Sequence, residues 1–599
     1  MISKAVIFFN QNKFLISFFF IALWSLPIWY VFDKPLWNYD YVWHYQGYEA
    51  AYQSIIKYHQ WPYFNPWMSA GQPLDGLPVI GFFSIRFLCV LFFGTQIGIH
   101  LSILTYWIIA FIGAYKLANY FWKTDFLKIC FSFLIVINSA VTAHLLVGHF
   151  PQQVVLLSPW LFYFYLQRDR DKWSGLKGGV IISLAINEYF PYGIMYVLVI
   201  GLILVLYDLR KKIDKNSLKN LILWLSSFLL TTSTLCYYRL ISTLYVMKGH
   251  DRVVDFSYTW DALMIFLSHF IPFIYSKPEQ WLTREMEFCG TYPEVGMYLG
   301  IISIYYIYLA IKNKFNIFHF FGLWLLISAY TNEYFFSLTY WLSYVPGFSS
   351  FLCDGRIIIV AGIFLAIAIV DGISISFKNK NKNKLPIVIF TIFVIEQFGV
   401  TGSMFYSARN MLESNSNLTN IIGSKLENLI ASKDQNFIFI NDLPESYKSA
   451  HRGFPVYSLT RNNIGVLSKT YSPNFPIFDL KNNHSEFYQN IFKQNNKTVY
   501  PISWSPNKIV FRNLDPKEMV EISYSPSKSW KVNGKYIYLH SNSVEKKSFF
   551  YAYPNSNGDL TLEYKPYFLN DKKVVFYILI ISFIFLCVYL NLFKKSNFR

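Results

Sequence analysis

The sequence predicts a polytopic α-helical membrane protein with about twelve spans and a β-rich domain near the C-terminus. The first reason is composition: 54% of the 599 residues are hydrophobic and only 15% are charged, against about 25% charged in soluble domains. The second is that apolar runs of span length alternate with short basic clusters. The third is that residues 401–572 are rich in Asn, Ser, Lys and Tyr and hold no apolar run of span length.

The net charge of +18 could indicate a nucleic-acid-binding protein, but the positions of the charges argue against it. Lys and Arg gather between apolar segments, at 168–172, 210–212, 378–384 and 594–595. Such clusters hold the short loops of a membrane protein on the cytoplasmic side. We therefore expect membrane lipids as partners and no nucleic acid.

The first span is expected at Phe14–Phe32, which has 19 residues without a charge and is followed by no small-residue cleavage site. Lys4 and Lys13 hold its start in the cytoplasm, so the polar and aromatic loop 33–78 should face outward. This gives a transmembrane module over 1–400 with 33–78 as its catalytic loop. An extracytoplasmic β-rich domain follows over 401–572, and 573–599 forms a last helix and a basic cytoplasmic tail.

Four local features refine this organisation. Val79–Phe93 is apolar but short and contains Arg86, so we expect a re-entrant or interfacial segment. Ile129–Val147 should be one continuous span. The apolar stretch 178–207 has basic clusters on both sides, which predicts a hairpin of two short spans with Glu188 at its outer turn. In the β-rich region, Asn533-Gly534 lies between runs of alternating polarity and predicts a tight hairpin.

Asp40 is the candidate general base, because it lies in the outward loop among aromatic residues that could raise its pKa and stack on sugar rings. The alternative is a solvated Asp beside an aromatic belt at the membrane interface. His44 and Gln46 follow it closely and are candidates for contact with substrate.

Other candidate substrate contacts lie further along the chain. His149 could donate a hydrogen bond to a sugar or phosphate, or could simply end a span, and Glu188 is an ionisable residue at membrane depth. Glu294 lies at the end of a long outward loop. Arg252 and Arg356 could hold a phosphate in a bidentate manner, the alternative for Arg356 being contact with lipid headgroups.

Several motifs are absent from the sequence. It contains no G-x-x-x-x-G-K-[ST], no H-E-x-x-H and no G-x-S-x-G motif. No cytoplasmic segment is long enough for a nucleotide-binding domain, which favours a lipid-borne donor. We expect no metal ligand, because no D-x-D pair lies beside Asp40, although a divalent cation stays open. Cys289 and Cys353 could pair, or all six cysteines could be free thiols.

Short motifs along most of the chain resemble YfhO-like membrane proteins, with Asp40 similar to the catalytic Asp of GT-C glycosyltransferases. The motifs are Pro62-x-x-Asn65-Pro66 with Gly71-x-Pro73, Gly148-His149 with Pro159, Glu294 through Gly300, Pro346-Gly347-Phe348 with Arg356, Trp530 through Lys535, and Tyr564-Lys565-Pro566. Phe64 stands where that family has Trp. Asn533 stands where it has Asp, two residues closer to Trp530 than in the family pattern.

The resemblance implies a GT-C-like fold and an inverting glycosyltransferase. It would move a sugar from a polyprenyl-phosphate donor to a glycopolymer or glycolipid acceptor outside the cytoplasmic membrane, with Asp40 as base. A transporter or lipid flippase is the alternative from another class. A polysaccharide polymerase and an inactive scaffold also stay open.

Overall fold

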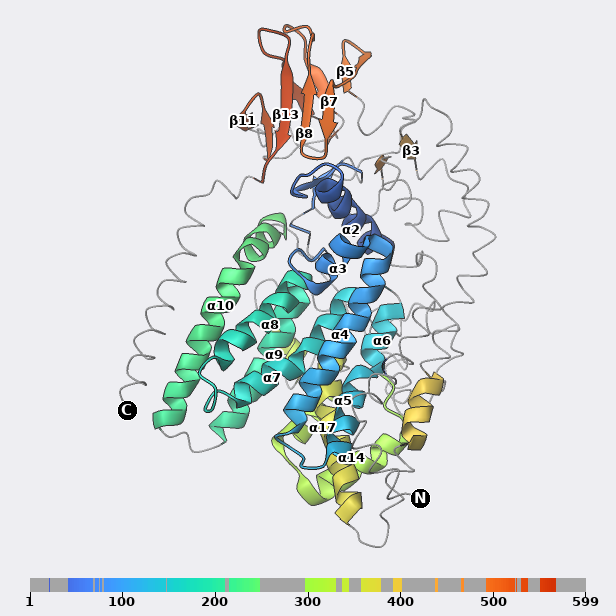
Figure 1. Cartoon of the computed structure of the whole chain (residues 1–599), viewed down its shortest axis with the longest axis vertical. Helices are drawn as coiled ribbons and strands as arrows, with labels where there is room; N and C mark the ends of the chain where they lie inside the picture. The colour runs from blue at the N-terminus through green and yellow to red at the C-terminus, as the bar shows by residue number, and fades with distance from the viewer. Residues whose placement is uncertain are drawn as a thin grey trace.

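The computed structural model describes a helical bundle, a polar segment packed on one end of it, and two β-sheets beyond that segment (Figure 1). The described residues are 21, 41–67, 71–74, 76–77, 80–146, 148–210, 215–247, 297–329, 337–343, 357–378, 391–400, 437–439, 465–467, 492–522, 524, 529–536 and 550–566.

The helices lie at α2 (Tyr41–Ile56), α3 (Ile85–Phe93), α4 (Thr95–Ala118), α5 (Asp125–Val136), α6 (Ser139–Leu146), the 3₁₀ helix η1 (Phe150–Leu157), α7 (Ser158–Leu166), α8 (Ser174–Glu188), α9 (Phe190–Leu209), α10 (Lys215–Met247), α14 (Ile301–Lys314), α15 (Ile317–Ser328), α16 (Leu338–Ser343) and α17 (Ile358–Lys378). A further apolar helix covers Thr391–Val400.

The strands lie at β1 (Phe64–Asn65), β2 (Gln72–Pro73), β3 (Phe437–Phe439), β4 (Gly465–Leu467), β5 (Phe492–Gln494), β6 (Lys497–Val499), β7 (Ser503–Ser505), β8 (Lys508–Phe511), β9 (Val520–Ile522), β10 (Trp530–Val532), β11 (Lys535–Tyr536), β12 (Phe550–Ala552) and β13 (Leu560–Tyr564).

Several helices are long and apolar enough to cross a bilayer, which needs about 20 residues. Within the described residues, five crossings meet this condition: Thr95–Ala118, Asp125–Leu145, Tyr192–Leu209, Asn216–Thr243 and Ile358–Phe377. The chain is therefore an integral membrane protein. The first and last expected spans, at 14–32 and 574–590, lie outside the described residues except for residue 21, so the total of about twelve spans stays a prediction.

The segment before α4 does not cross the membrane. Helix α3 has nine residues, capped at its start by the Ser84 side chain, and it ends at Gly94, whose φ is +76°. Nine residues rise only about 13 Å, less than half of a bilayer core. The helix folds back on α4, where a Cβ on Gly98 would lie 2.5 Å from the Cα of Val90. The expected short, non-spanning segment is thus a hairpin of α3 with α4.

The expected hairpin around Glu188 is present. Helix α8 ends at Glu188, and α9 begins with proline in its first turn. Arg168 lies just before α8, and its Nη2 is 2.7 Å from Oδ2 of Asp208 near the end of α9. Helix α9 therefore returns to the end of the bundle at which α8 begins. Helix α10 runs beside α8, where Gly175 leaves no room for a Cβ against Ser227.

The expected single span over Ile129–Val147 is wrong in one respect, because the helix breaks between α5 and α6. Asn138 lies at the break, and its Oδ1 accepts a hydrogen bond from the backbone N of Ala140 at 3.0 Å. The Ser139 hydroxyl donates to the carbonyl of Tyr298 at 2.8 Å. The Asn138 side chain thus supplies an acceptor that a continuous helix would supply from its backbone, while Ser139 joins the break to the backbone of Tyr298. The two halves together still form one of the apolar crossings.

The C-terminal strands form the expected β-rich region as two antiparallel sheets, in the orders β11-β10-β13-β8-β7 and β12-β9-β5-β6. Their inner faces share one aromatic core, in which the Phe492 and Phe511 rings lie 4.9 Å apart. Strands β10 and β11 form the predicted hairpin, with φ of +48° at Asn533 and +83° at Gly534. Both central residues have positive φ, as a type I′ turn requires.

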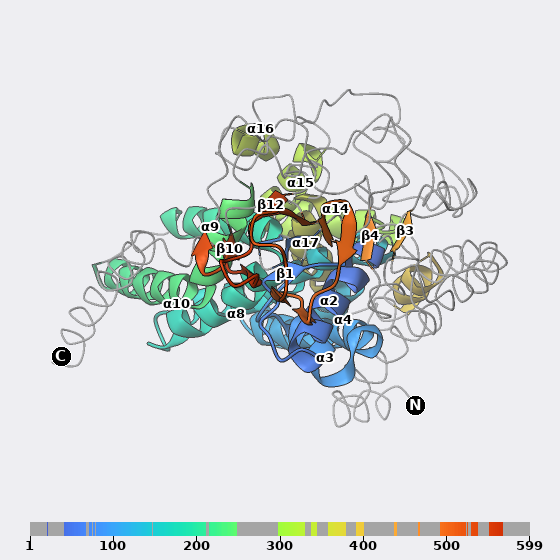
Figure 2. The ribbon, with the colours of Figure 1, turned by 90° about the horizontal axis from the view of Figure 1, so that it is seen from above.

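The sheets are joined to the membrane module through the loop between α2 and α3, which lies between the bundle and the sheets (Figure 1). Seen from above, the sheets overlie the bundle near α2 (Figure 2). The Phe64 side chain is 1% exposed and belongs to the aromatic core of the sheets rather than to that of the helices. Asn507 Nδ2 donates to the carbonyl of Trp61 at 2.6 Å, and Gln60 Nε2 donates to the Ser505 hydroxyl at 2.9 Å.

Candidate functional site

The described part of the candidate site lies where α2 packs on the bundle. His44, Gln46, His149 and Glu188 lie within the described residues. Asp40, Arg252, Glu294 and Arg356 lie outside them. Helix α2 begins at Tyr41, directly after Asp40 in the sequence.

Glu188 is held by a buried ion pair that the sequence alone does not predict. Its Oε1 lies 2.6 Å from Nη1 of Arg86, and both side chains are 0% exposed. The hydroxyl of Tyr106 donates to the other carboxylate oxygen at 3.2 Å. A buried charge is costly unless it is paired and hydrogen-bonded. Glu188 and Arg86 therefore stabilise each other.

Arg86 also contacts the 3₁₀ helix η1 and α4. Its Nη2 donates to Oε1 of Gln153 at 2.8 Å, and its Nε donates to the Ser102 hydroxyl at 3.1 Å. Its guanidinium lies over the Phe150 ring, 4.7 Å from the centroid. Arg86 thus connects α3 with α4, η1 and α8. The sequence feature that points to Arg86 is its place inside an apolar run, because an arginine at membrane depth is usually functional or paired.

Helix α2 lies directly over this pair. The backbone N of Gly81 donates to the Tyr48 hydroxyl at 3.1 Å. A Cβ on Gly81 would lie 2.5 Å from the Cα of Glu188, so the loop before α3 is pressed against the end of α8. Burial and the negative charge of Glu188 raise the pKa of Tyr48. Its hydroxyl is therefore neutral near neutral pH and can both accept and donate a hydrogen bond.

Two histidines continue the cluster on its other side. The Nδ1 atoms of His144 and His149 lie 3.0 Å apart, so one of them carries the proton that the other accepts. The His44 ring lies 5.2 Å from the Phe150 ring, on which Arg86 also packs. The structure thus brings His44, His149 and Glu188 into one neighbourhood through η1.

Gln46 faces a different partner. Its amide pairs reciprocally with that of Asn65, with Nε2 donating at 3.3 Å and Oε1 accepting at 3.1 Å. Asn65 Oδ1 also accepts from the backbone N of Trp67 at 3.1 Å. This pair fixes the loop that holds Phe64 to α2, so Gln46 acts as a positioning residue for the loop.

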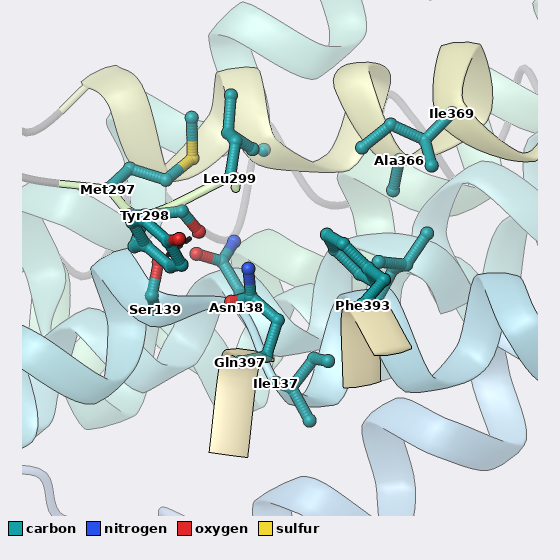
Figure 3. Close-up of a pocket in the computed structure, with 12 residues that line it drawn as sticks. Ile137, Asn138, Ser139, Met297, Tyr298, Leu299, Ala366, Ile369, Phe393 and Gln397 are labelled. Atoms are coloured by element: carbon teal, nitrogen blue, oxygen red, sulfur yellow. Dashed lines mark hydrogen bonds between the residues drawn. The ribbon is translucent and has the colours of Figure 1, made fainter. Parts of the chain in front are cut away.

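A second cluster of polar side chains lies at the break between α5 and α6. These side chains line a cavity of about 20 Å³ (Figure 3). Asn138, Ser139 and Gln397 are its polar lining residues. Gln397 is 2% exposed, and its Nε2 has no hydrogen-bond partner within the described part of the chain. The neighbouring Glu396 accepts a hydrogen bond from the Tyr298 hydroxyl at 2.6 Å. Both polar side chains belong to an otherwise apolar helix.

The chemistry available in the main cluster is positioning and hydrogen bonding. Glu188 is already paired with Arg86, so it is not a free base in this arrangement. The cluster holds α2, which begins directly after Asp40, through His44 and Tyr48. Among the described residues, no group of three or more His, Cys, Asp or Glu side chains could hold a metal ion.

Comparison with known proteins gives one similarity. A scan against protein-family models and a search of curated proteins find no match. Among solved structures, the chain is similar to the arabinofuranosyltransferase AftD from Mycobacteria, with a TM-score of 0.41 and 10% sequence identity. The match covers 66% of this chain and 27% of AftD. A TM-score below 0.5 does not define a shared fold.

Proposed function

We propose that this protein is a membrane glycosyltransferase. It transfers a sugar from a polyprenyl-phosphate donor to a glycopolymer or glycolipid on the extracytoplasmic side of the cytoplasmic membrane. Asp40 deprotonates the acceptor hydroxyl as it attacks the sugar's anomeric carbon, and the lipid phosphate leaves, so the anomeric configuration inverts.

One observation carries the proposal: the segment that follows Asp40 is held at two places, through Tyr48 in α2 and through Phe64 in the loop after it. Helix α2 rests on the Arg86–Glu188 pair through Tyr48 and Gly81. The loop after α2 is fixed to the sheets by Phe64 and to α2 by Gln46. A base for acyl or glycosyl transfer needs this kind of rigid support, because small displacements of a reacting group lower the rate steeply. A solvated interfacial Asp needs none of it.

Asp40→Asn tests the role of the base. The amide has nearly the same shape but cannot accept the proton, so we expect transfer to fall by a factor of about 10² or more. Asp33→Asn is the matched control, since Asp33 lies in the same loop and the same charge is removed. The measurement is release of lipid phosphate by the purified chain in nanodiscs. Equal activity of both variants would refute the assignment of Asp40.

The donor phosphate needs cationic partners, for which Arg252 and Arg356 are our candidates, and Glu294 is a further candidate for contact with substrate. Arg356→Lys keeps the charge but loses the bidentate geometry. We expect a higher KM for the lipid donor with a smaller change in kcat. An unchanged KM in the Lys and Ala variants would remove Arg356 from the donor site.

We propose that transfer needs no resident metal, since no D-x-D pair lies beside Asp40. Activity in EDTA equal to activity in excess Mg²⁺ or Mn²⁺ is the expected result. Loss in EDTA with recovery on adding either ion would show a metal-dependent enzyme.

A transporter or flippase is the second candidate, favoured by the break between α5 and α6. Broken helices with polar side chains beside them mark substrate and ion paths in many transporters. Asn138, Glu396 and Gln397 have these features. Movement of labelled lipid-linked sugar across sealed proteoliposomes, without covalent product, would favour transport. A new glycosidic bond in the product would favour transfer.

A further inference from the structure

The outward face of the sheet β12-β9-β5-β6 carries exposed tyrosines. Along β12, Phe550 and Ala552 are buried in the core, whereas Tyr551 is 44% exposed. Tyr553, two residues beyond Tyr551, is 56% exposed. Alternate residues of a strand point to opposite faces. Strand β12 ends at Ala552, but the same alternation continues one step beyond it, with Ala552 and Pro554 buried and Tyr551 and Tyr553 exposed, so the two tyrosines lie on the same outward face.

The strand register places further side chains beside the tyrosines. Tyr551 is opposite Glu521 on β9, and Glu521 is opposite Lys493 on β5. Met519 precedes β9, is 46% exposed, and comes opposite Tyr553 when the register is extended by one residue. These five residues form one strip across three strands, which we name the tyrosine strip.

The polar members of the tyrosine strip are arranged around the ring of Tyr551. Its hydroxyl is hydrogen-bonded to the carboxylate of Glu521, which helps to hold the ring in place. The Lys493 side chain is opposite Glu521 on the next strand. The strip thus combines apolar surface with one acceptor and one donor, and its two charges cancel.

The other sheet shows that this composition is not shared by the whole domain. There the outward residues in register are Tyr536, Lys531, Glu563 and Lys508, of which the three charged ones alternate in sign, and Lys531 Nζ lies 4.5 Å from the centroid of the Tyr536 ring. Alternating charges across strands are typical of a solvated face. The other sheet thus carries one tyrosine, with Lys531 over its ring, on a charged face, whereas the tyrosine strip carries two exposed tyrosines.

From this geometry we propose that the tyrosine strip binds a neutral glycan chain. Sugar rings present apolar C–H faces that pack on aromatic rings, and their hydroxyls both donate and accept hydrogen bonds. Tyr551 and Tyr553 supply the packing surface, while Glu521 and Lys493 supply an acceptor and a donor. Because the charges of the strip cancel, it has no attraction for a strongly acidic partner or an anionic membrane.

This inference rests on the proposed function, since it assigns to the domain the acceptor of that reaction. Figure 1 shows the sheets beyond α2, on the side of the bundle at which the segment following Asp40 lies. A polymer bound to the strip would be retained near that segment between transfer steps. Loss of the strip should raise the KM for long acceptors and leave short ones unaffected.

The test is binding of the full-length chain in nanodiscs to a printed array of defined neutral and acidic oligosaccharides. We expect binding to neutral glycans, and Tyr551→Ala and Tyr553→Ala should each weaken it by about tenfold. Tyr536→Ala is the matched control, because Tyr536 lies on β11 of the other sheet. Tyr551→Phe keeps the ring and should retain more binding than Tyr551→Ala.

Transfer to a short acceptor, with release of lipid phosphate from the donor, is measured in parallel. The chain could bind glycans, lose this binding in the strip variants, and show no transferase activity. That result would support glycan binding by the tyrosine strip and refute the proposed transferase function. Active enzyme whose glycan binding is unchanged by Tyr551→Ala and Tyr553→Ala would refute the strip alone. Preference of the wild type for acidic glycans, or binding to no glycan on the array, would also overturn it.

Discussion

The ring of Phe64, in the loop after α2, stacks on the ring of Tyr564 near the end of the chain, with centroids 4.6 Å apart. Trp530 and Tyr524 close around it at 5.0 and 5.3 Å. Phe64 and Trp530 belong to two separate motifs by which the sequence resembles YfhO-like proteins. Their contact gives those motifs a shared physical role, which is to fix the sheets on the membrane module.

Phe64→Ala should release the sheets from the bundle. Truncating a buried Phe costs about 3–5 kcal/mol. We expect the sheets to become sensitive to protease while the bundle keeps its melting temperature. Bundle unfolding can be followed with a thiol-reactive dye at the buried Cys130 and Cys236, with the other cysteines replaced by serine. Phe92→Ala is the control, because Phe92 is 78% exposed. Equal protease sensitivity of the two variants would contradict the anchor.

Gly71→Ala should mimic loss of the anchor. Gly71 has φ of +82°, and a Cβ there would lie 2.0 Å from the Phe64 ring. Gly534 has φ of +83° with no atom within 4 Å of a Cβ, so Gly534→Ala carries the backbone strain alone. Strain of this kind costs about 1 kcal/mol. We expect Gly71→Ala to destabilise the sheets clearly more than Gly534→Ala in urea unfolding followed by tryptophan fluorescence. Equal effects would mean that the Phe64 ring moves aside freely.

The features that the sequence predicts well are local ones. The turn at Asn533-Gly534 needs only two residues that tolerate positive φ. The hairpin turn at Glu188 follows from basic clusters on both sides and a proline just after it. The short α3 segment follows from its length. In each case the physical cause lies within a few residues of the feature.

The features that the sequence does not predict depend on distant partners. Arg86 interrupts an apolar run in the sequence. Neither the residues around Arg86 nor those around Glu188 predict that the two side chains pair. The break at Asn138 has no proline or glycine beside it, and it is stabilised by Tyr298 from another part of the chain. Gln46 was expected to contact substrate, yet its amide is paired with Asn65. Asp40, Arg252, Glu294 and Arg356 lie outside the described residues, so their roles stay proposals.

Tyr298→Phe should destabilise the bundle at the break between α5 and α6. The lost hydroxyl donates to Glu396 at 2.6 Å, on a carboxylate whose other oxygen has no partner within the described residues. Removing a hydrogen bond to a charged group costs about 1.5–3 kcal/mol. Tyr298→Phe combined with Glu396→Leu should recover part of the loss, because the unpaired carboxylate is gone. Tyr305→Phe, at a 52% exposed position, is the control and should have no effect on the thiol-dye melting curve.

The Arg86–Glu188 pair should show strong coupling in a double-mutant cycle. Arg86→Met leaves Glu188 buried without its cation, and Glu188→Gln leaves Arg86 without its anion, each costing about 3–5 kcal/mol. In the double variant neither charge is left uncompensated, so its cost should be well below the sum of the two. Melting temperatures from the thiol dye give the cycle, with Lys177→Met and Asp171→Asn, an exposed pair 2.7 Å apart, as the control cycle. There solvent screens the charges and the coupling should be near zero. Additive effects at Arg86 and Glu188 would show that each is stabilised by its other contacts. If the Arg86–Glu188 pair supports α2, which follows Asp40, transfer activity should also fall in each single variant and recover in part in the double variant.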